Sequence, residues 1–319
     1  MLSDASNHCE GCTNKDFCGY WFYKYHVTNP KQILDSLFDR GFIRYANLKE
    51  HLNKAKILDL KRMLVKYGMI KTGKKATLIQ RLMEGVSPEV LLKEFPKKIY
   101  ALTEKGKKEL QDNSYILLVH RKDYDMDIWQ INILKHEHPN CPVRDLIWGN
   151  YNKLLLEHIK NFDFGLYGAT KYRMASFLME ENKYENALPI LSEAIFYELS
   201  GLGNNCNPNN IYSFVKISRS FWFPYKKSII KIPPAFTKML VNIKEKLDLS
   251  DEQLEKQLIN EFRRFKLFFQ IFTSEECSRI VMSELNKDIG TIEKIFDVAE
   301  KRLEKTLKNK LGKAYYNEF

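Results

Sequence analysis

Apolar residues recur at helical spacing along most of the 319-residue chain. In the first third, each run lasts only two or three turns before Gly, Pro or a polar stretch interrupts it, which predicts short helices. Pro30 suits the first turn of one helix, and Thr103 is a good N-cap for another. The expected helices lie at about residues 30–40, 57–67, 74–84, 88–94 and 104–111, with a short strand at about 98–102.

After Asn113 the helical pattern becomes longer, although Pro139, Pro142 and Gly149 interrupt its beginning. Helices are expected at about residues 151–161, 168–182, 184–200, 235–247, 251–272, 274–286 and 288–309. The fold class is therefore expected to be mainly α. We expect three parts: a Cys-rich aromatic segment (1–30), a small helical region (31–113) and an α-helical domain (114–319).

The formal charge of +11 is concentrated near the N-terminus. Residues 47–82 hold 10 basic and 2 acidic residues, whereas residues 121–319 hold 30 basic and 27 acidic. Basic charge gathered in one segment is typical of proteins that bind a polyanion. The alternative is a solvated basic surface without a partner.

Composition and the lengths of the apolar runs indicate the compartment in which the protein is expected. With 44% hydrophobic and 29% charged residues the chain is typical of globular proteins. Its beginning has neither a basic leader nor an apolar segment, and its longest apolar run, 115–119, is far shorter than the roughly 18 residues of a membrane helix. We expect a cytoplasmic protein with reduced thiols and no membrane partner. Its many Lys, Asn and Ile residues favour a low-GC bacterial or phage origin.

Residues 57–84 have the pattern of a helical hairpin. Gly68 fits a left-handed stop after the first helix, and Gly73 supplies a permissive turn before the second. The two apolar faces that can pack together consist of Leu60, Met63, Leu64 and Tyr67 on the first helix and Leu78, Ile79 and Leu82 on the second. Basic residues are left pointing largely outward: Lys61, Arg62, Lys66, Lys71, Lys74, Lys75 and Arg81. Lys74 and Lys75 fall at a helix N-terminus, which favours phosphate.

Residues 52–84 resemble the SAP domain, a short DNA-binding motif of chromatin, repair and bacteriophage proteins. The matching residues are Leu60-Lys61, Leu64, Gly68-Met69, Gly73-Lys74-Lys75, Leu78-Ile79 and Arg81-Leu82. Met69 departs from the Leu that is usual there. The resemblance implies sequence-tolerant binding of duplex DNA through the seven basic residues, although some members bind RNA or proteins. The alternative is a purely structural hairpin.

Two further patterns lie around this hairpin. Gly68-x-x-x-x-Gly73-Lys74 approaches a P-loop, but Lys75 replaces the required Ser or Thr and a helix precedes it, which argues against nucleotide binding. Residues 99–106 are similar to the segment between the wing and the last helix of winged-helix regulators. That similarity implies one composite DNA-binding unit; the alternative is a turn leading into a capped helix.

The spacing Cys9-x2-Cys12-x5-Cys18 brings three thiols within ten residues. Such spacing is typical of structural zinc sites, for which His26 or His8 could supply the fourth ligand. It also occurs around iron–sulfur clusters, where Cys141 is the expected fourth ligand. The remaining alternative is three reduced thiols without a cofactor. More distant candidates are His136, His138 and Cys141, while Cys206 is expected in a loop and Cys277 inside a helix.

The C-terminal part is similar to a tetratricopeptide-like helical hairpin. Its matching positions are Ala175, Ala187, Leu191 and Ala194, with 184–188 opening the second helix. The resemblance implies a surface for self-association or for another protein, and the alternative is an irregular bundle. An aromatic stripe at helical spacing is expected to be core: Phe262, Phe265, Phe268, Phe269 and Phe272.

Motifs of common catalytic sites are absent from the sequence, including G-x-S-x-G, H-E-x-x-H and a dinucleotide fingerprint. We therefore expect a DNA-binding protein encoded by a phage or mobile element, without enzymatic activity. The alternative is a helical interaction scaffold in which the basic hairpin is structural.

Overall fold

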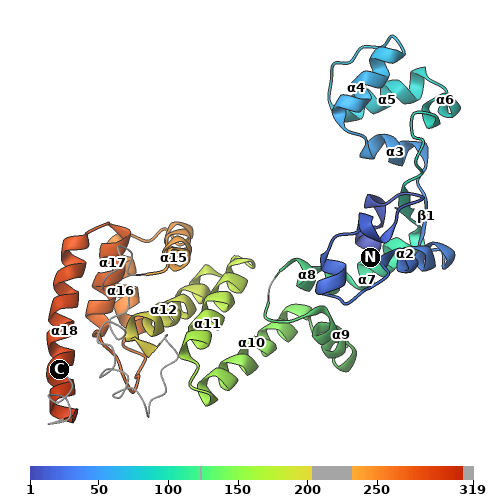
Figure 1. Ribbon diagram of the computed structural model, residues 1–319. Coiled ribbons are helices and arrows are strands. Elements are labelled where there is room, and N and C mark those ends of the chain that lie inside the picture. The colour runs from blue at the N-terminus through green and yellow to red at the C-terminus, as the bar shows by residue number, and fades with distance from the viewer. Residues whose placement is uncertain (123, 203–231, 312–319) are drawn as a thin grey trace. The chain divides into compact units, whose positions relative to one another are not determined.

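The computed structural model describes residues 1–122, 124–202 and 232–311. Helices dominate these residues, which confirms the expected mainly α fold. The chain divides into two compact units, Met1–Leu118 and Val119–Phe319 (Figure 1). Within the described ranges, every helix is too short or too polar to cross a membrane.

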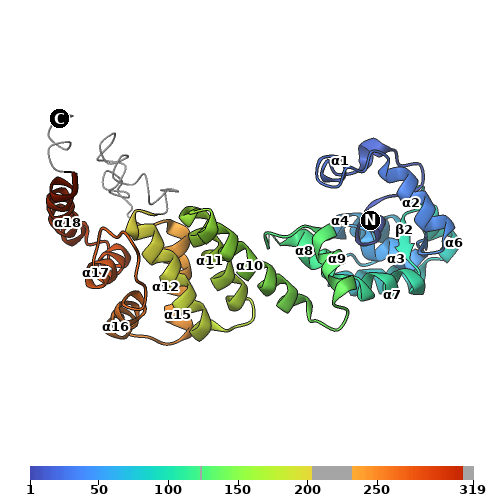
Figure 2. The same ribbon diagram turned by 90° about the horizontal axis from the view of Figure 1, so that it is seen from below.

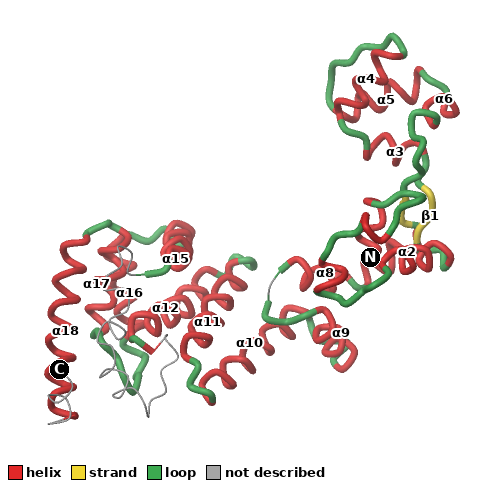
Figure 3. The backbone as a smooth tube through the Cα atoms, viewed as in Figure 1, coloured by secondary structure: helices red, strands yellow, loops and turns green. Residues whose placement is uncertain are grey.

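The first unit combines short helices with a two-stranded antiparallel sheet (Figure 3). Ile43 lies opposite Leu102, and Tyr45 opposite Tyr100. The elements are η1 (Leu2–Asn7), η2 (Asn14–Asp16), α1 (Tyr20–Tyr23), α2 (Pro30–Asp39), β1 (Ile43–Tyr45), α3 (Leu48–Lys54), α4 (Ile57–Lys66), α5 (Lys75–Gly85), α6 (Pro88–Leu92), β2 (Tyr100–Leu102) and α7 (Glu104–Asp112). Helix α8 (Ser114–Arg121) spans the division between the units. Strand β1 was not expected, because its three residues are too few to show an alternation of apolar and polar positions.

Two hydrophobic cores stabilise the first unit. One lies under the sheet and holds Ala5, Cys12, Phe17, Leu34, Ile43 and Tyr100. The other belongs to helices α3–α6, which we call the hairpin module, and holds Leu52, Leu60, Leu64, Leu78, Ile79, Leu82 and Leu91. Because strands β1 and β2 precede and follow the hairpin module in the chain, their pairing brings its two ends together.

The second unit is helical throughout its described part. Helix α12 is central, since it contacts α11 on one side and α15 and α16 on the other (Figure 2). Ala175, Ala187, Leu191 and Ala194 are buried between these helices. The elements are α9 (Ile128–Glu137), α10 (Val143–Lys160), α11 (Phe164–Met179), α12 (Tyr184–Ser200), α15 (Pro234–Lys246), α16 (Asp251–Phe262), α17 (Ser274–Leu285) and α18 (Ile289–Leu311).

The helix expected at 251–272 is wrong beyond Phe262, where α16 ends. The aromatic rings after Phe262 pack against two different helices. One face of a single straight helix could not contact both. Phe265 lies against Phe196 of α12, and Phe272 lies against Phe296 of α18 with ring centroids 4.8 Å apart. Phe262, Phe269 and Phe272 are buried as expected, whereas Phe268 is half exposed.

The beginning of the second unit also differs from expectation. Helix α10 starts at Val143, well before the expected 151, because Pro142 is its N-cap and Gly149 is accommodated inside it. Helix α9 was not expected, although Asp127 forms a capping box with Gln130 at its start.

Candidate nucleic-acid interface

Helices α4 and α5 form the hairpin predicted from their apolar spacing. Leu60 and Leu64 are fully buried with Leu78 and Leu82 in the core of the hairpin module. Helix α4 ends at Lys66, and Gly68 two residues later has a left-handed φ of 70°. The Met69 N–H then donates to the Leu64 carbonyl at 2.7 Å, which satisfies a carbonyl at the helix end.

The loop between α4 and α5 is fixed by Arg81. Its Nη1 atom donates to the carbonyls of Ile70 at 2.7 Å and Thr72 at 2.6 Å. Gly73 adopts a φ of 128°, which favours glycine, and a Cβ there would lie 3.4 Å from the Cβ of Thr77. Arg81 was expected to point outward and contact phosphate. In the structure the residue is half-buried, and its guanidinium binds these two loop carbonyls.

Three lysines of the hairpin module are available to a ligand. Lys71 and Lys74 are exposed and Lys61 is half-buried, and none has an ion pair or hydrogen bond within the residues the structure describes. Arg62 pairs with Asp59 at 3.4 Å, but both side chains are largely exposed. Such a pair is weak and leaves the guanidinium accessible.

The other two lysines have internal partners. Lys66 pairs with Glu94 at 2.5 Å, and the Tyr67 hydroxyl donates to the same carboxylate at 2.6 Å. These hydrogen bonds, from Lys66 first and Tyr67 second, lower the pKa of Glu94. The Lys75 Nζ atom donates to the Asn53 carbonyl of α3 at 2.5 Å. The first contact ties α4 to the turn after α6, and the second ties α5 to α3.

The N-terminus of α5 adds a further attraction for anions. Lys74 is the N-cap residue, no side chain caps the helix, and its first turn contains no acidic residue. The first N–H groups of a helix lack intrahelical acceptors, and the helix dipole is positive there. Lys71 and Lys74 therefore flank backbone donors that can bind a phosphate oxygen.

The cysteine segment does not gather around a common point. Cys9 pairs with Ile99 in an isolated bridge, Cys12 is buried, and Cys18 and His26 are exposed. Burial raises the pKa of the Cys12 thiol. Within the described ranges, no three His, Cys, Asp or Glu side chains are grouped to hold a metal ion. The zinc and iron–sulfur hypotheses stay predictions.

The other candidate ligands have structural surroundings. His8 is buried, stacks on Phe17 with ring centroids 4.0 Å apart, and contacts an Asp4 oxygen at 3.1 Å. Cys277 is buried in α17, and this burial raises its thiol pKa well above the usual range. Near α9, the Cys141 N–H donates to the His138 carbonyl. His136 belongs to the last turn of α9, and Cys206 lies outside the described residues.

A scan against models of protein families finds no match, and searches of curated proteins and of solved structures find no similar chain. The SAP, winged-helix and tetratricopeptide resemblances therefore stay predictions from the residues that carry them.

Proposed function

We propose that the chain is a cytoplasmic, non-enzymatic DNA-binding protein whose hairpin module binds the backbone of duplex DNA. The observation that carries this proposal is the placement of Lys71 and Lys74, free of partners among the described residues, beside the uncapped N-terminus of α5, with Lys61 of α4 also unpaired there. The same proposal includes an origin in a phage or mobile element, which the many Lys, Asn and Ile residues of the chain support.

Binding through phosphates has two expected consequences, one for the salt dependence of the affinity and one for its dependence on base sequence. Each lysine that neutralises a phosphate releases condensed counterions, so affinity falls with salt concentration. Phosphate contacts carry no direct information about base sequence. We therefore expect steep salt dependence and similar affinity for unrelated duplexes.

The second unit has a different proposed role. Its charge is nearly balanced, with 30 basic and 27 acidic residues in 121–319. We propose that it mediates self-association or binds another protein. Zinc in the Cys9–Cys18 segment is a further proposal that its spacing supports.

A second candidate function is a helical interaction scaffold with a structural hairpin. The internal contacts of Lys66, Lys75 and Arg81 favour it, because they reduce the charge available to DNA. Exposed apolar side chains on the same module also favour a protein partner: Leu58, Val65 and Ile70.

Fluorescence anisotropy of the full chain with labelled 20-base-pair duplexes of unrelated sequence distinguishes the two functions. Changing Lys71 and Lys74 together to Ala should weaken binding to every duplex. The slope of log K against log salt should become shallower by roughly 2, since two phosphate contacts are lost.

The matched control changes Lys256 and Lys294 to Ala, which removes the same charge from exposed positions of the second unit. It should leave affinity and slope nearly unchanged. Salt-independent binding, or an equal effect of the two double variants, would favour the scaffold.

A further inference from the structure

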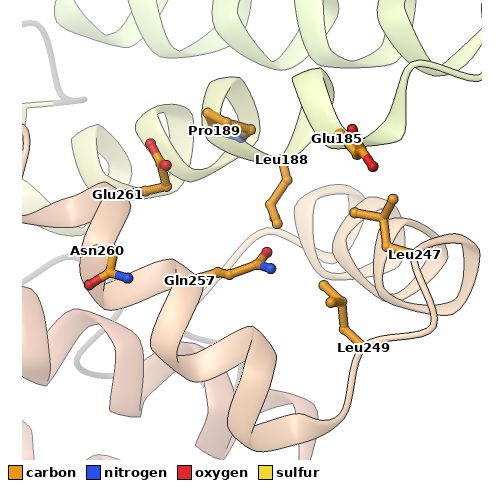
Figure 4. Close-up of a pocket in the computed structure, with 8 residues that line it drawn as sticks. All are labelled: Glu185, Leu188, Pro189, Leu247, Leu249, Gln257, Asn260 and Glu261. Carbon is orange, nitrogen blue, oxygen red and sulfur yellow. The ribbon is translucent and has the colours of Figure 1, made fainter.

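Charge distinguishes the loop between α4 and α5 from the open groove between α12 and α16 in the second unit (Figure 4). In that groove Arg264 engages the Glu261 carboxylate at 2.7 Å, and basic residues occupy the last turn of the adjacent α15. Acidic and basic groups offset one another there, so the groove favours neither sign of charge. By contrast, residues 67–74 contain Lys71 and Lys74 and no acidic residue. The loop therefore favours a polyanion.

Ile70 is an exposed apolar residue on a fixed part of this loop. The residue is 67% exposed, whereas the preceding Met69 packs against the core of the hairpin module. The Ile70 carbonyl accepts a hydrogen bond from Arg81 at 2.7 Å, and the same Nη1 atom donates to the Thr72 carbonyl at 2.6 Å. Exposed turns favour Gly, Pro, Asn, Asp and Ser. Packing within the hairpin module therefore does not explain an isoleucine at this position.

The neighbours of Ile70 set it apart from the other exposed apolar residues of the module. Leu58 and Val65 belong to α4, outside the loop. Ile70 is followed directly by Lys71, which has no partner among the described residues, and Lys74 lies four positions away. The carbonyls on both sides of Lys71 accept from one guanidinium nitrogen, which holds this part of the backbone together. A strand whose phosphates bind the two lysines therefore lies beside the Ile70 side chain.

We propose that Ile70 packs against a deoxyribose of the bound strand and makes the hairpin module select DNA over RNA. The selection depends on the proposed function, because Lys71 and Lys74 must bind phosphates of the same strand. Sugars join successive phosphates, and their C–H groups are the apolar part of the backbone. In RNA each sugar carries a 2′-hydroxyl, which is both a donor and an acceptor. Burying this hydroxyl against Ile70 leaves it without a hydrogen bond, whereas deoxyribose buries only apolar surface.

Fluorescence anisotropy of the full chain with labelled duplexes of one sequence, made as DNA and as RNA, tests the role of Ile70. Ile70→Ser removes the apolar surface and adds a hydroxyl that can hydrogen-bond to ribose. We expect DNA affinity to fall about fivefold, as for the loss of roughly 40 Å² of apolar contact. RNA affinity should stay the same or rise, so the preference for DNA falls by at least about fivefold. The salt slope should not change, because no phosphate contact is lost.

The change in preference between variant and wild type is the decisive quantity, because the A-form geometry of the RNA duplex affects both proteins alike. Leu156→Ser is the matched control, since Leu156 is 70% exposed on α10 of the second unit. It should change neither the DNA affinity nor the preference. Because Ile70 is exposed, its substitution is not expected to disturb folding.

Lys71→Ala distinguishes failure of this role from failure of the proposed function. It should weaken binding to both duplexes and make the salt slope shallower by about 1. If it does so while Ile70→Ser leaves the preference unchanged, or weakens both duplexes equally, Ile70 does not select the sugar and the proposed function stands. Salt-independent binding by the wild-type chain would overturn both.

Discussion

The guanidinium of Arg81 donates to the carbonyl of Ile70, at 2.7 Å and across eleven positions of the chain. Together with the contact to Thr72, it fixes the loop that carries Lys71. A loop ordered before binding loses less conformational entropy when it meets a ligand. Arg81 thus has a positioning role in the proposed DNA interface.

Changing Arg81 to Ala should weaken binding of the full chain to duplex DNA about fivefold, corresponding to roughly 1 kcal/mol of added ordering cost. The salt slope should stay the same, because no phosphate contact is lost. Anisotropy titrations at several salt concentrations measure both quantities.

Arg62→Ala is the matched control, since it removes an exposed guanidinium with only a weak internal partner. It should make the salt slope shallower by about 1. If Arg81→Ala produces that same loss of slope, Arg81 contacts phosphate directly, as the sequence analysis expected.

A second prediction concerns the packing of α7 against the sheet. The Gly106 N–H donates to its N-cap Thr103, and a Cβ at Gly106 would lie 2.0 Å from the carbonyl oxygen of Phe42. Because this neighbour is backbone, α7 would have to shift. Gly106→Ala should lower the free energy of unfolding of the first unit by about 2 kcal/mol or more, measured by urea denaturation.

Gly149→Ala serves as the control. This exposed glycine lies inside α10, and a Cβ there meets nothing within 4 Å. It should stabilise the second unit by up to about 1 kcal/mol, since alanine favours the helix. If Gly106→Ala leaves the free energy of unfolding of the first unit unchanged, this result would contradict the close approach of α7 to Phe42.

The zinc hypothesis is tested by metal content. It predicts about one zinc ion per chain in protein purified without chelator, lost in Cys12→Ser. Cys277→Ser should retain the metal, because Cys277 is fully buried inside α17 of the second unit. Visible absorbance with iron would indicate a cluster instead. Less than about a tenth of an equivalent of any metal would leave Cys9, Cys12 and Cys18 as ordinary thiols.

The hairpin was predictable because its determinants are local. Leucines at helical spacing bring Leu60 and Leu64 onto one face, and Gly68 marks the end of α4. The partner of Arg81 was not predictable, because its acceptors are backbone carbonyls whose positions depend on the loop. A basic residue on the outward face of a helix has the same sequence pattern whether its side chain is free or binds the backbone of a neighbouring loop.

Longer-range packing explains the other errors. The helical spacing of Phe262, Phe265 and Phe272 suggested one continuous helix, but α16 ends at Phe262. Beyond this point Phe265 packs against α12 and Phe272 packs against α18.

The last prediction separates the roles of the two units. Because α8 spans their division, fragments 1–122 and 114–319 should both include it. The first fragment contains the hairpin module with Lys61, Lys71 and Lys74, so it should retain most of the DNA affinity and the salt slope of the full chain. The second holds the largest hydrophobic core and should fold as a helical unit that carries any self-association.

DNA titration and light scattering of each fragment measure these properties, with circular dichroism to verify folding. If fragment 114–319 binds DNA as tightly as the whole chain, the basic hairpin is incidental and the charge distribution of the sequence was misleading. If both fragments fold but only the intact chain binds, the interface requires both units. Binding that strengthens with self-association would then indicate two hairpin modules on one duplex, since linked sites raise the effective concentration of the second contact.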